Sequence, residues 1–292
     1  MPDPVLKRIQ ALPIWHGKTI ATPLSGGRTN LNYKVTDGRG SYVVRLGDDI
    51  PAHHVMRFNE LAASHAAHAA GLSPEVVFAE VGLTVIRHVE STTLTELDVG
   101  QPQYLSKIVE LMRRCHYDIP KYLRGPSLVF WVFHVIRDYA ATLTAHASPH
   151  IPRLPYFLAI AAKLEAAVGP IELVFGHNDL MAANILDDGT RLWLIDWDYA
   201  GHNSALFDLG GLASNNMLTH TQELDMLGLY YGKMPDQALL HRYQAMKCAS
   251  LLREVMWSMV SEAISGLDID YAAYTAENLT RFERAYETYK QS

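Results

Sequence analysis

HNDLMAAN (residues 177–184) and LIDWD (residues 194–198) are the two stretches that decide the fold of this 292-residue chain. The first places a carboxylate, Asp179, five residues before the amide of Asn184, and the second places Asp196 directly after a short apolar run. Phosphoryl transfer needs a group that orients or deprotonates the attacking hydroxyl, together with oxygen ligands that hold Mg²⁺ against the ATP phosphates. Asp179 suits the first role, and Asn184 with Asp196 suits the second. The pattern therefore predicts a small-molecule kinase.

The residues around and between these stretches predict a β-hairpin. Asn184 to Leu186 is typical of a short strand, residues 187–189 (DDG) are a turn sequence, and Leu192 to Ile195 supplies the partner strand. We expect this hairpin to bring Asn184 close to Asp196, a pair of oxygen ligands that suits Mg²⁺ because this ion keeps several waters and also binds substrate phosphates. The alternative is an ordinary hairpin with solvated acidic ends.

The N-terminal third contains a candidate phosphate loop between two expected strands, Thr19–Pro23 and Leu31–Thr36. Paired glycines let backbone N–H groups approach phosphates closely. Ser-Gly-Gly is also a common hairpin turn, which is the competing interpretation. The ATP-binding residues that we expect in this loop are Ser25, Gly26, Gly27, Thr29 and Asn30.

A cation and a carboxylate follow the loop at positions where an ATP site needs them. The expected strand Tyr42–Leu46 carries Arg45, which can make a bidentate contact with the phosphates of ATP. An Ala-rich helix is expected over Met56–Ala70, with Glu60 in its first turns. We expect Glu60 to pair with Arg45 in the ATP site, and the alternative is a solvated helical glutamate.

These residues together show a resemblance to the choline/ethanolamine kinase family. That family belongs to the wider aminoglycoside-phosphotransferase-like group, which has a protein-kinase-like fold. The stretches that carry the resemblance are LSGGRTNLNYKV (24–35), VVRLG (43–47), HNDLMAAN (177–184) and LIDWDYAGHNSALFD (194–208). The resemblance implies an α+β fold with two lobes, a small antiparallel-sheet N-terminal lobe and a mainly helical C-terminal lobe.

The resemblance also implies a chemistry, with ATP and Mg²⁺ as cofactors and choline or ethanolamine as the substrate. By this resemblance Asp179 is the catalytic base, Asn184 and Asp196 hold magnesium, and Arg45 contacts ATP. Asp198 matches a position that assists a second metal ion, and its alternative role is to neutralise a nearby cation. Asp208 is expected to cap a helix, as an N-cap, or to brace the catalytic loop rather than to touch the substrate.

Recognition of the acceptor is expected in the last third of the chain. Trp257, Tyr271 and Tyr274 are the candidate aromatic walls for a cationic group, although an aromatic residue on an apolar helix is more often part of the core. Family members commonly carry a second Trp where this chain has Glu254, and a carboxylate there suits a primary amine better than a trimethylammonium group. The alternative is that Glu254 replaces an acidic residue that family members carry after Asp208.

The sequence divides into an N-terminal lobe over residues 1–88 and a C-terminal lobe over residues 89–292, with the hinge at Val89–Thr95. With 49% apolar residues, no run approaching the ~20 apolar residues of a membrane span, no signal-like start and two cysteines, the chain is expected to be a cytoplasmic enzyme without membrane insertion. The net charge of −6 argues against a nucleic-acid partner. Thiamine or an aminoglycoside as the substrate, a catalytically silent ATP-binding protein, and the oligomeric state stay open.

Overall fold

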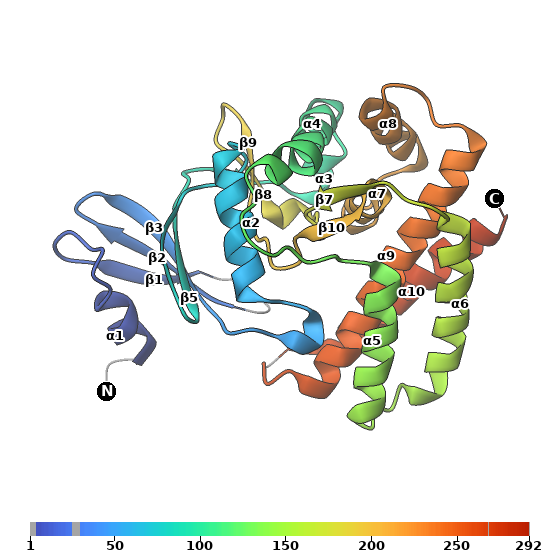
Figure 1. Ribbon diagram of the computed structural model, residues 1–292, viewed down its shortest axis with the longest axis horizontal. Coiled ribbons are helices and arrows are strands. Elements are labelled where there is room, and N and C mark those ends of the chain that lie inside the picture. The colour runs from blue at the N-terminus through green and yellow to red at the C-terminus, as the bar shows by residue number, and fades with distance from the viewer. Residues whose placement is uncertain (1–3, 25–29, 268, 292) are drawn as a thin grey trace.

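The computed structural model describes residues 4–24, 30–267 and 269–291, and it joins a five-stranded antiparallel sheet to a larger, mainly helical region (Figure 1). The strand order is β1-β2-β3-β5-β4, and each neighbouring pair is antiparallel. Along β3 the side chains of Tyr42, Val44 and Leu46 are buried, as expected for a sheet with one covered face. The strands of this sheet are β1 (Ile20–Leu24), β2 (Leu31–Asp37), β3 (Gly40–Leu46), β4 (Val76–Glu80) and β5 (Leu83–Arg87).

Two helices accompany the sheet. α1 (Pro4–Gln10) places Ile9 in a small core with Val35, Val44 and Val85 of the strands. α2 (Arg57–Ala69) instead buries Ala63, Ala66 and Ala67 in the core of the helical region. α2 therefore belongs to both regions, since its charged first turn faces the sheet and its apolar side packs on the helices.

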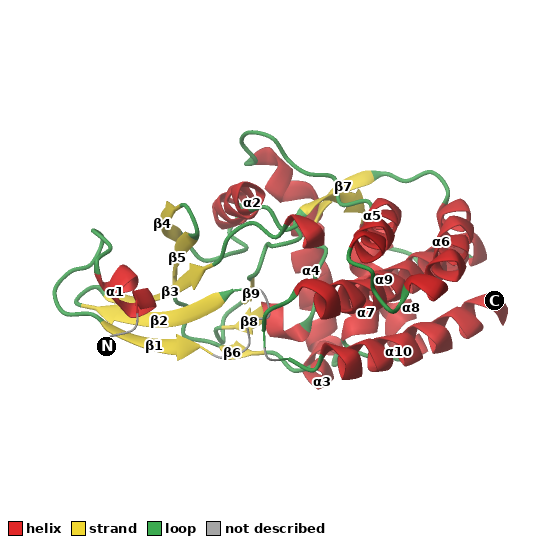
Figure 2. Cartoon of the chain, turned by 90° about the horizontal axis from the view of Figure 1, so that it is seen from below, coloured by secondary structure: helices red, strands yellow, loops and turns green. Residues whose placement is uncertain are grey.

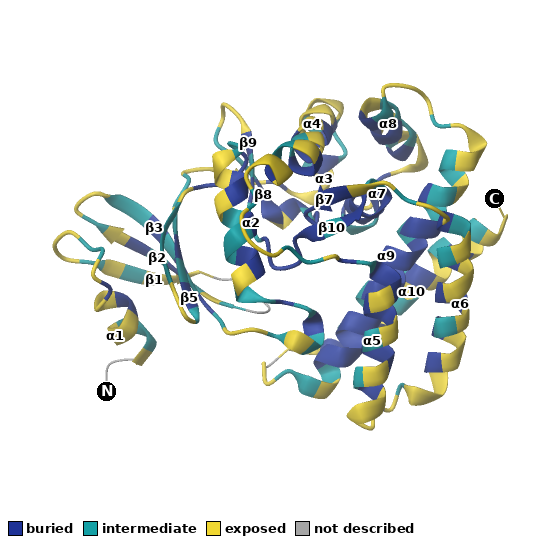
Figure 3. Cartoon of the chain, in the orientation of Figure 1, coloured by how far each residue is buried: buried dark blue, intermediate teal, exposed yellow. Residues whose placement is uncertain are grey.

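The helical region is organised around α9, which is buried along much of its length and is surrounded by α5, α6, α7 and α10 (Figures 1 and 3). The helices of this region are α3 (Glu96–Val99), α4 (Pro102–Asp118), α5 (Val132–Ala145), α6 (Leu154–Val168), α7 (Ala205–Asn215), α8 (His220–Tyr231), α9 (Gln237–Ile264) and α10 (Tyr271–Gln291). Four short 3₁₀ turns accompany them, at Pro51–His53, Ile119–Lys121, Ile151–Arg153 and Ala182–Asn184.

Short strands lie where the two regions meet (Figure 2). β6 (Thr92–Thr93), β8 (Ile185–Asp187) and β9 (Leu192–Leu194) form one sheet, and β7 (Leu173–Gly176) pairs with β10 (Gly201–Ser204). The predicted hairpin is therefore confirmed as β8 and β9, with Ile185 opposite Leu194.

The predicted α+β architecture, with a small antiparallel sheet followed by a helical region, is confirmed. The lobe boundary at residue 88 stays a prediction. Within the described part of the chain, no helix is both long and apolar enough to cross a membrane.

Candidate active site

The loop that carries Asp179 follows β7 and is held by Asp208 of α7. The backbone N–H groups of His177 and Asn178 donate to the Asp208 carboxylate at 2.8 and 2.7 Å. Asn178 has a φ of 64°, in the left-handed region that Asn tolerates better than most residues. Two hydrogen bonds to one buried carboxylate therefore fix the sharp turn that precedes Asp179.

Asp208 is itself held by α4. The distance between His116 Nε2 and an Asp208 carboxylate oxygen is 2.9 Å, and both side chains are buried. Burial alone would raise the pKa of Asp208, but the hydrogen bond and charge of His116 and the donors of His177 hold the pKa below its ordinary value. The N-cap of α7 is Ser204, whose hydroxyl accepts from Leu206 N, so the expectation that Asp208 is an N-cap is wrong and its bracing role stands.

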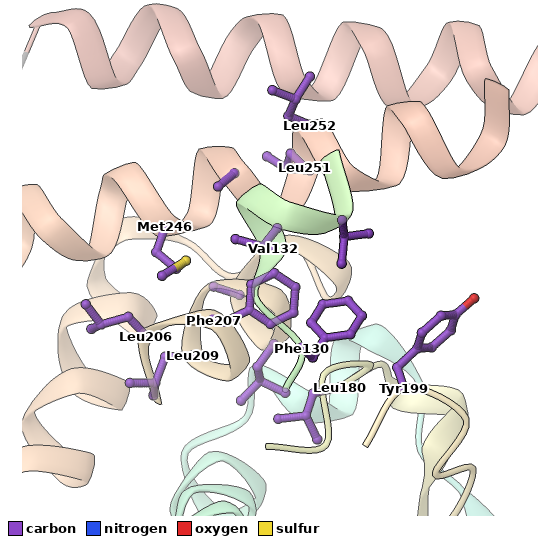
Figure 4. Close-up of a cluster of buried hydrophobic side chains, with 14 of the residues drawn as sticks. Phe130, Val132, Leu180, Tyr199, Leu206, Phe207, Leu209, Met246, Leu251 and Leu252 are labelled. Carbon is purple, nitrogen blue, oxygen red and sulfur yellow. The ribbon is translucent and has the colours of Figure 1, made fainter. Parts of the chain in front are cut away.

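The far side of the same loop is fixed by Asn216 and by an apolar anchor. Asn216 accepts from Ala182 N at 2.8 Å and donates to the carbonyl oxygens of Leu180 and Leu212. The Leu180 side chain enters the cluster around Phe130 and Phe207 (Figure 4). Polar and apolar contacts together leave the loop little freedom, which suits a catalytic segment.

Asp179 lines a pocket of about 800 Å³ together with Asn184, Asp196 and Asp198. Burial raises the pKa of Asp179 to about 7; the charge of Arg253 lowers it, while nearby carboxylates raise it further. Asn184 donates its amide N–H to the Asp179 carbonyl at 3.0 Å. This hydrogen bond directs the amide nitrogen of Asn184 to the loop, so its oxygen remains as a candidate metal ligand.

Arg45 of β3 connects the sheet to the two carboxylates after β9. Its guanidinium lies 3.1 Å from Glu60, 3.0 Å from Asp196 and 3.1 Å from Asp198. Burial alone would raise the pKa of Asp196, but Arg45 keeps it below its ordinary value. Burial and the like charge of Asp196 raise the pKa of Asp198. The predicted Arg45–Glu60 pair is present.

Arg57 is a second cation in this network, and sequence reasoning missed it. It lies 2.7 Å from Glu60 and 2.9 Å from Asp198, and it donates to Asn30 Oδ1 at 2.7 Å. Asn30 in turn donates to Asp198 at 3.2 Å. Asp198 is therefore bound by residues of the sheet region, which favours its alternative role as the neutralising partner of cations.

The predicted substrate residues Glu254, Trp257 and Tyr274 line the same pocket. Tyr274 OH donates to Glu254 at 2.7 Å, and Trp257 Nε1 donates to Tyr199 OH at 2.7 Å. In Figure 4 the Tyr199 hydroxyl points away from the apolar cluster that holds its ring. Together these residues build one end of the pocket from a carboxylate and aromatic rings.

Tyr271 lies behind this wall rather than in it. Its ring contacts Trp257 edge-on at 6.2 Å, and its hydroxyl accepts from Ser265. Tyr271 is not among the described residues that line the pocket, and its contact with the acceptor stays a prediction. His53 stacks on Trp257 at 4.9 Å, which leaves a smaller part of the indole surface for a ligand.

The pocket is also lined by Leu94 and Thr95 of the expected hinge, by the adjacent Glu96 and by Asn30. One pocket therefore joins residues of the expected hinge, a sheet-region residue and the acceptor wall. The remaining phosphate-loop residues predicted to bind ATP, Ser25, Gly26, Gly27 and Thr29, lie outside the described residues.

The donor set fits a magnesium ion. Asn184 and Asp196 supply an amide and a carboxylate oxygen, and the Asp196 side chain is 36% exposed toward the pocket. Among the described residues there is no group of three or more His, Cys, Asp or Glu side chains arranged to hold a metal. Mg²⁺ commonly binds through one or two carboxylates, waters and substrate phosphates, so a sparse oxygen set is appropriate.

The structure thus brings together all the predicted catalytic and metal residues and three of the four predicted substrate residues. The residues that sequence reasoning missed are Arg57, Arg253, Tyr199 and Asn216. Arg57 lies three residues before Glu60 in α2, and Arg253 directly precedes Glu254 in α9. This closeness to a predicted site carboxylate was visible in the sequence and could have identified both arginines. No local signal marks Tyr199 or Asn216, whose roles depend on tertiary contacts.

Comparisons with known proteins agree with this geometry. The model of the phosphotransferase enzyme family matches residues 20–245. Protein LicA of Haemophilus influenzae is 26% identical over 268 residues, 88% of this chain and 78% of the relative. A probable ethanolamine kinase of Arabidopsis thaliana is 26% identical over 286 residues, 86% of this chain and 75% of the relative. The crystal structure of a choline/ethanolamine kinase family protein from Mesorhizobium loti is similar with a TM-score of 0.78 and 25% identity, covering 97% of this chain and 94% of that one.

Proposed function

We propose, from the premise that the chain belongs to the phosphotransferase enzyme family, that it transfers the γ-phosphate of ATP to the hydroxyl of a small amino alcohol. The observation that carries this proposal is the shared pocket, which Asp179 lines together with Asn184 and Asp196 and with Glu254 and Trp257. A relative named as a probable ethanolamine kinase and a solved structure named as a choline/ethanolamine kinase family protein both suggest this acceptor class. Within the class we propose a primary amine of the ethanolamine type.

Asp179 is the residue that receives or orients the acceptor hydroxyl. Its carboxylate is partly exposed to the pocket, and its backbone is fixed by the hydrogen bonds that Asp208 accepts from the two preceding residues. A carboxylate whose pKa is raised to about 7 can accept a proton near neutral pH. The loop therefore presents a base of suitable strength at a fixed position.

Asn184 and Asp196 would hold magnesium, which supplies charge neutralisation at the ATP phosphates when bound. Arg45, fixed by Glu60, provides a guanidinium for the phosphates at the end of β3. Leu94 and Thr95 of the expected hinge line the same pocket and are the proposed contacts of the adenine.

The acceptor ammonium is received by Glu254, with the Trp257 and Tyr274 rings beside it. A primary ammonium has three N–H groups to donate to a carboxylate, whereas a trimethylammonium has none and depends on ring faces. His53 covers part of the Trp257 surface, which reduces the ring area available to a quaternary cation. A carboxylate that can accept N–H groups, together with a partly covered Trp257 ring, favours ethanolamine over choline.

The direct test is ADP release with Mg²⁺-ATP against ethanolamine, choline, dimethylethanolamine, thiamine and kanamycin. We expect turnover of ethanolamine above that of choline, and loss of turnover by several orders of magnitude in Asp179→Ala with nucleotide binding retained. Turnover of thiamine or kanamycin alone would contradict the acceptor class. Nucleotide binding without turnover of any acceptor would favour a catalytically silent protein.

A second variant tests the acceptor wall. Trp257→Ala is expected to raise the KM of the acceptor at least about tenfold while the KM of ATP changes little, because the ring is proposed to contact the acceptor and not the nucleotide. Equal changes in both constants would assign Trp257 to the core.

A further inference from the structure

Arg253 is a buried cation of α9 that lines the pocket together with Glu254 and Trp257. Its exposed fraction is 4%. Its Nη1 donates to Glu254 Oε2 at 3.0 Å. Its guanidinium carbon lies 4.3 Å from the centre of the Tyr199 ring and 5.6 Å from that of Phe130.

Burying a guanidinium at this position costs free energy. Removing a cation from water carries a large desolvation penalty, and the pairing partner must offset it. The buried Tyr139 side chain interacts with the Arg253 guanidinium, and Glu254 is the carboxylate to which this guanidinium donates a hydrogen bond. The ion pair with Glu254 is therefore the contact through which Arg253 can act on the pocket.

Resting on the proposed function, we propose that Arg253 is a specificity-determining positioning residue, which fixes the Glu254 carboxylate so that the pocket selects an acceptor ammonium with N–H groups. The Glu254 carboxylate is held at both oxygens, by Arg253 on Oε2 and by Tyr274 OH on Oε1 at 2.7 Å. Each oxygen keeps a further lone pair that can accept an ammonium N–H. A carboxylate fixed in advance receives a directional hydrogen bond without the cost of ordering a flexible side chain on binding.

The aromatic contacts of Arg253 extend this positioning to the rest of the wall. Arg253 lies over the ring of Tyr199, and Tyr199 accepts the indole N–H of Trp257. Tyr274, the second partner of Glu254, meets Trp257 edge-on at 6.3 Å. Arg253 therefore supports both the Glu254 carboxylate, directly, and the Trp257 ring, through Tyr199.

The test compares the wild-type protein with Arg253→Met and Arg253→Lys, using ethanolamine and choline as paired acceptors. Methionine is an apolar replacement for a buried charged group and often preserves the fold. For Arg253→Met we expect the KM of ethanolamine to rise about tenfold, the ethanolamine-to-choline ratio of kcat/KM to fall toward one, and the KM of ATP to change less than about twofold. Arg253→Lys retains the charge without the planar fork, so an intermediate ratio is expected.

Two further variants separate positioning from general packing. Tyr274→Phe keeps the ring and removes the other hydrogen bond to Glu254, so it should lower the same ratio. Arg242→Met, on the same helix, removes contacts with the carbonyls of Val168 and Pro170 and should leave the ratio unchanged. Thermal unfolding of each variant shows whether the fold is intact.

The outcomes are distinct. A wild-type preference for ethanolamine that Arg253→Met retains, in a folded protein, overturns the inference about Arg253 alone. A wild-type preference for choline also overturns it, because the pocket then does not select N–H groups. Absence of turnover of both amines by the wild-type protein overturns the proposed function, and this inference with it.

Discussion

Arg57 Nη1 lies 2.9 Å from Asp198 Oδ1, an ion pair that joins the first turn of α2 to the segment after β9. The same guanidinium contacts Glu60, Asn30 and the carbonyl of Asp48. One side chain thus links four segments that surround the expected phosphate site. Among the described residues, Arg45 and Arg57 are the guanidiniums paired with the carboxylates of Glu60, Asp196 and Asp198, so the loss of either cation increases the uncompensated negative charge of this network.

Arg57→Met is expected to weaken nucleotide binding about tenfold, because Asn30 and Asp198 lose their shared partner. Binding of a fluorescent ATP analogue, titrated at fixed Mg²⁺, measures the change. Arg8→Met is the matched control, since the Arg8–Glu80 pair lies in the same region with side chains 44% and 41% exposed and contributes at most about 1 kcal/mol. Equal weakening in both variants would show that the network does not organise the nucleotide site.

The raised pKa of Asp179 predicts how the free energy of unfolding depends on pH. Its pKa in the folded protein is about 7, raised by burial from 3.8, so the folded state binds more protons than the unfolded state between about pH 4 and 7. Stability from this group is therefore lost as the pH rises through that window. Asp179→Asn removes the buried charge and should stabilise the protein at pH 8 by about 1–2 kcal/mol, with a much smaller effect at pH 5.

Urea unfolding at the two pH values measures this difference. Asp118→Asn, a change at a more exposed carboxylate near the end of α4, serves as the control and should change stability by no more than about 0.5 kcal/mol at either pH. A stabilisation by Asp179→Asn that is the same at pH 5 and pH 8 would contradict the raised pKa.

Because Asp208 holds the catalytic loop, its substitution is expected to lower both the stability of the protein and the rate of turnover. Asp208→Asn replaces one acceptor oxygen by an NH₂ group, which then faces a donor from the loop or from His116. We expect the free energy of unfolding to fall by about 2–4 kcal/mol and kcat to fall while the acceptor KM changes little. Unfolding and steady-state kinetics on one preparation check both effects, and unchanged kcat in the folded variant would show that the loop keeps its position without this carboxylate.

The sequence predicted the parts of the site that local spacing determines. The turn at residues 187–189 and the apolar residues on either side of it suffice to form the β8–β9 hairpin, and the hairpin by itself brings Asn184 and Asp196 together. The Arg45–Glu60 pair could also be predicted from the sequence, because a strand cation and a helical carboxylate are expected partners in such a fold.

The remaining parts depend on long-range packing. Tyr271 and Tyr274 are three residues apart, and only the angle at which α10 meets α9 decides that Tyr274 reaches Glu254 while Tyr271 lies behind Trp257. Asp208 resembled an N-cap by its place in the sequence, yet α7 begins one turn earlier at Ser204. The carboxylate is thereby directed to the catalytic loop.

The contact between α7 and α9 supports a last prediction, which rests on two adjacent glycines. A Cβ at Gly210 would lie 2.9 Å from Lys247 Cα and 3.1 Å from Lys247 N, which are backbone atoms that cannot move independently of α9. A Cβ at Gly211 would meet Ser250 Oγ at 3.8 Å, an ordinary contact distance. Gly210→Ala should therefore destabilise the protein by about 1–3 kcal/mol, because α7 must separate from α9.

Gly211→Ala is the matched control in the same helix. Alanine is favoured over glycine in a helix interior by up to about 1 kcal/mol, so this variant should be neutral or slightly stabilised. Urea unfolding of the two variants measures the contrast. Because α7 carries Asp208 and α9 carries Glu254, Gly210→Ala should also reduce kcat/KM for the acceptor, whereas Gly211→Ala should not. Equal stability of the two variants would mean that the helices are not in the close contact on which the site depends.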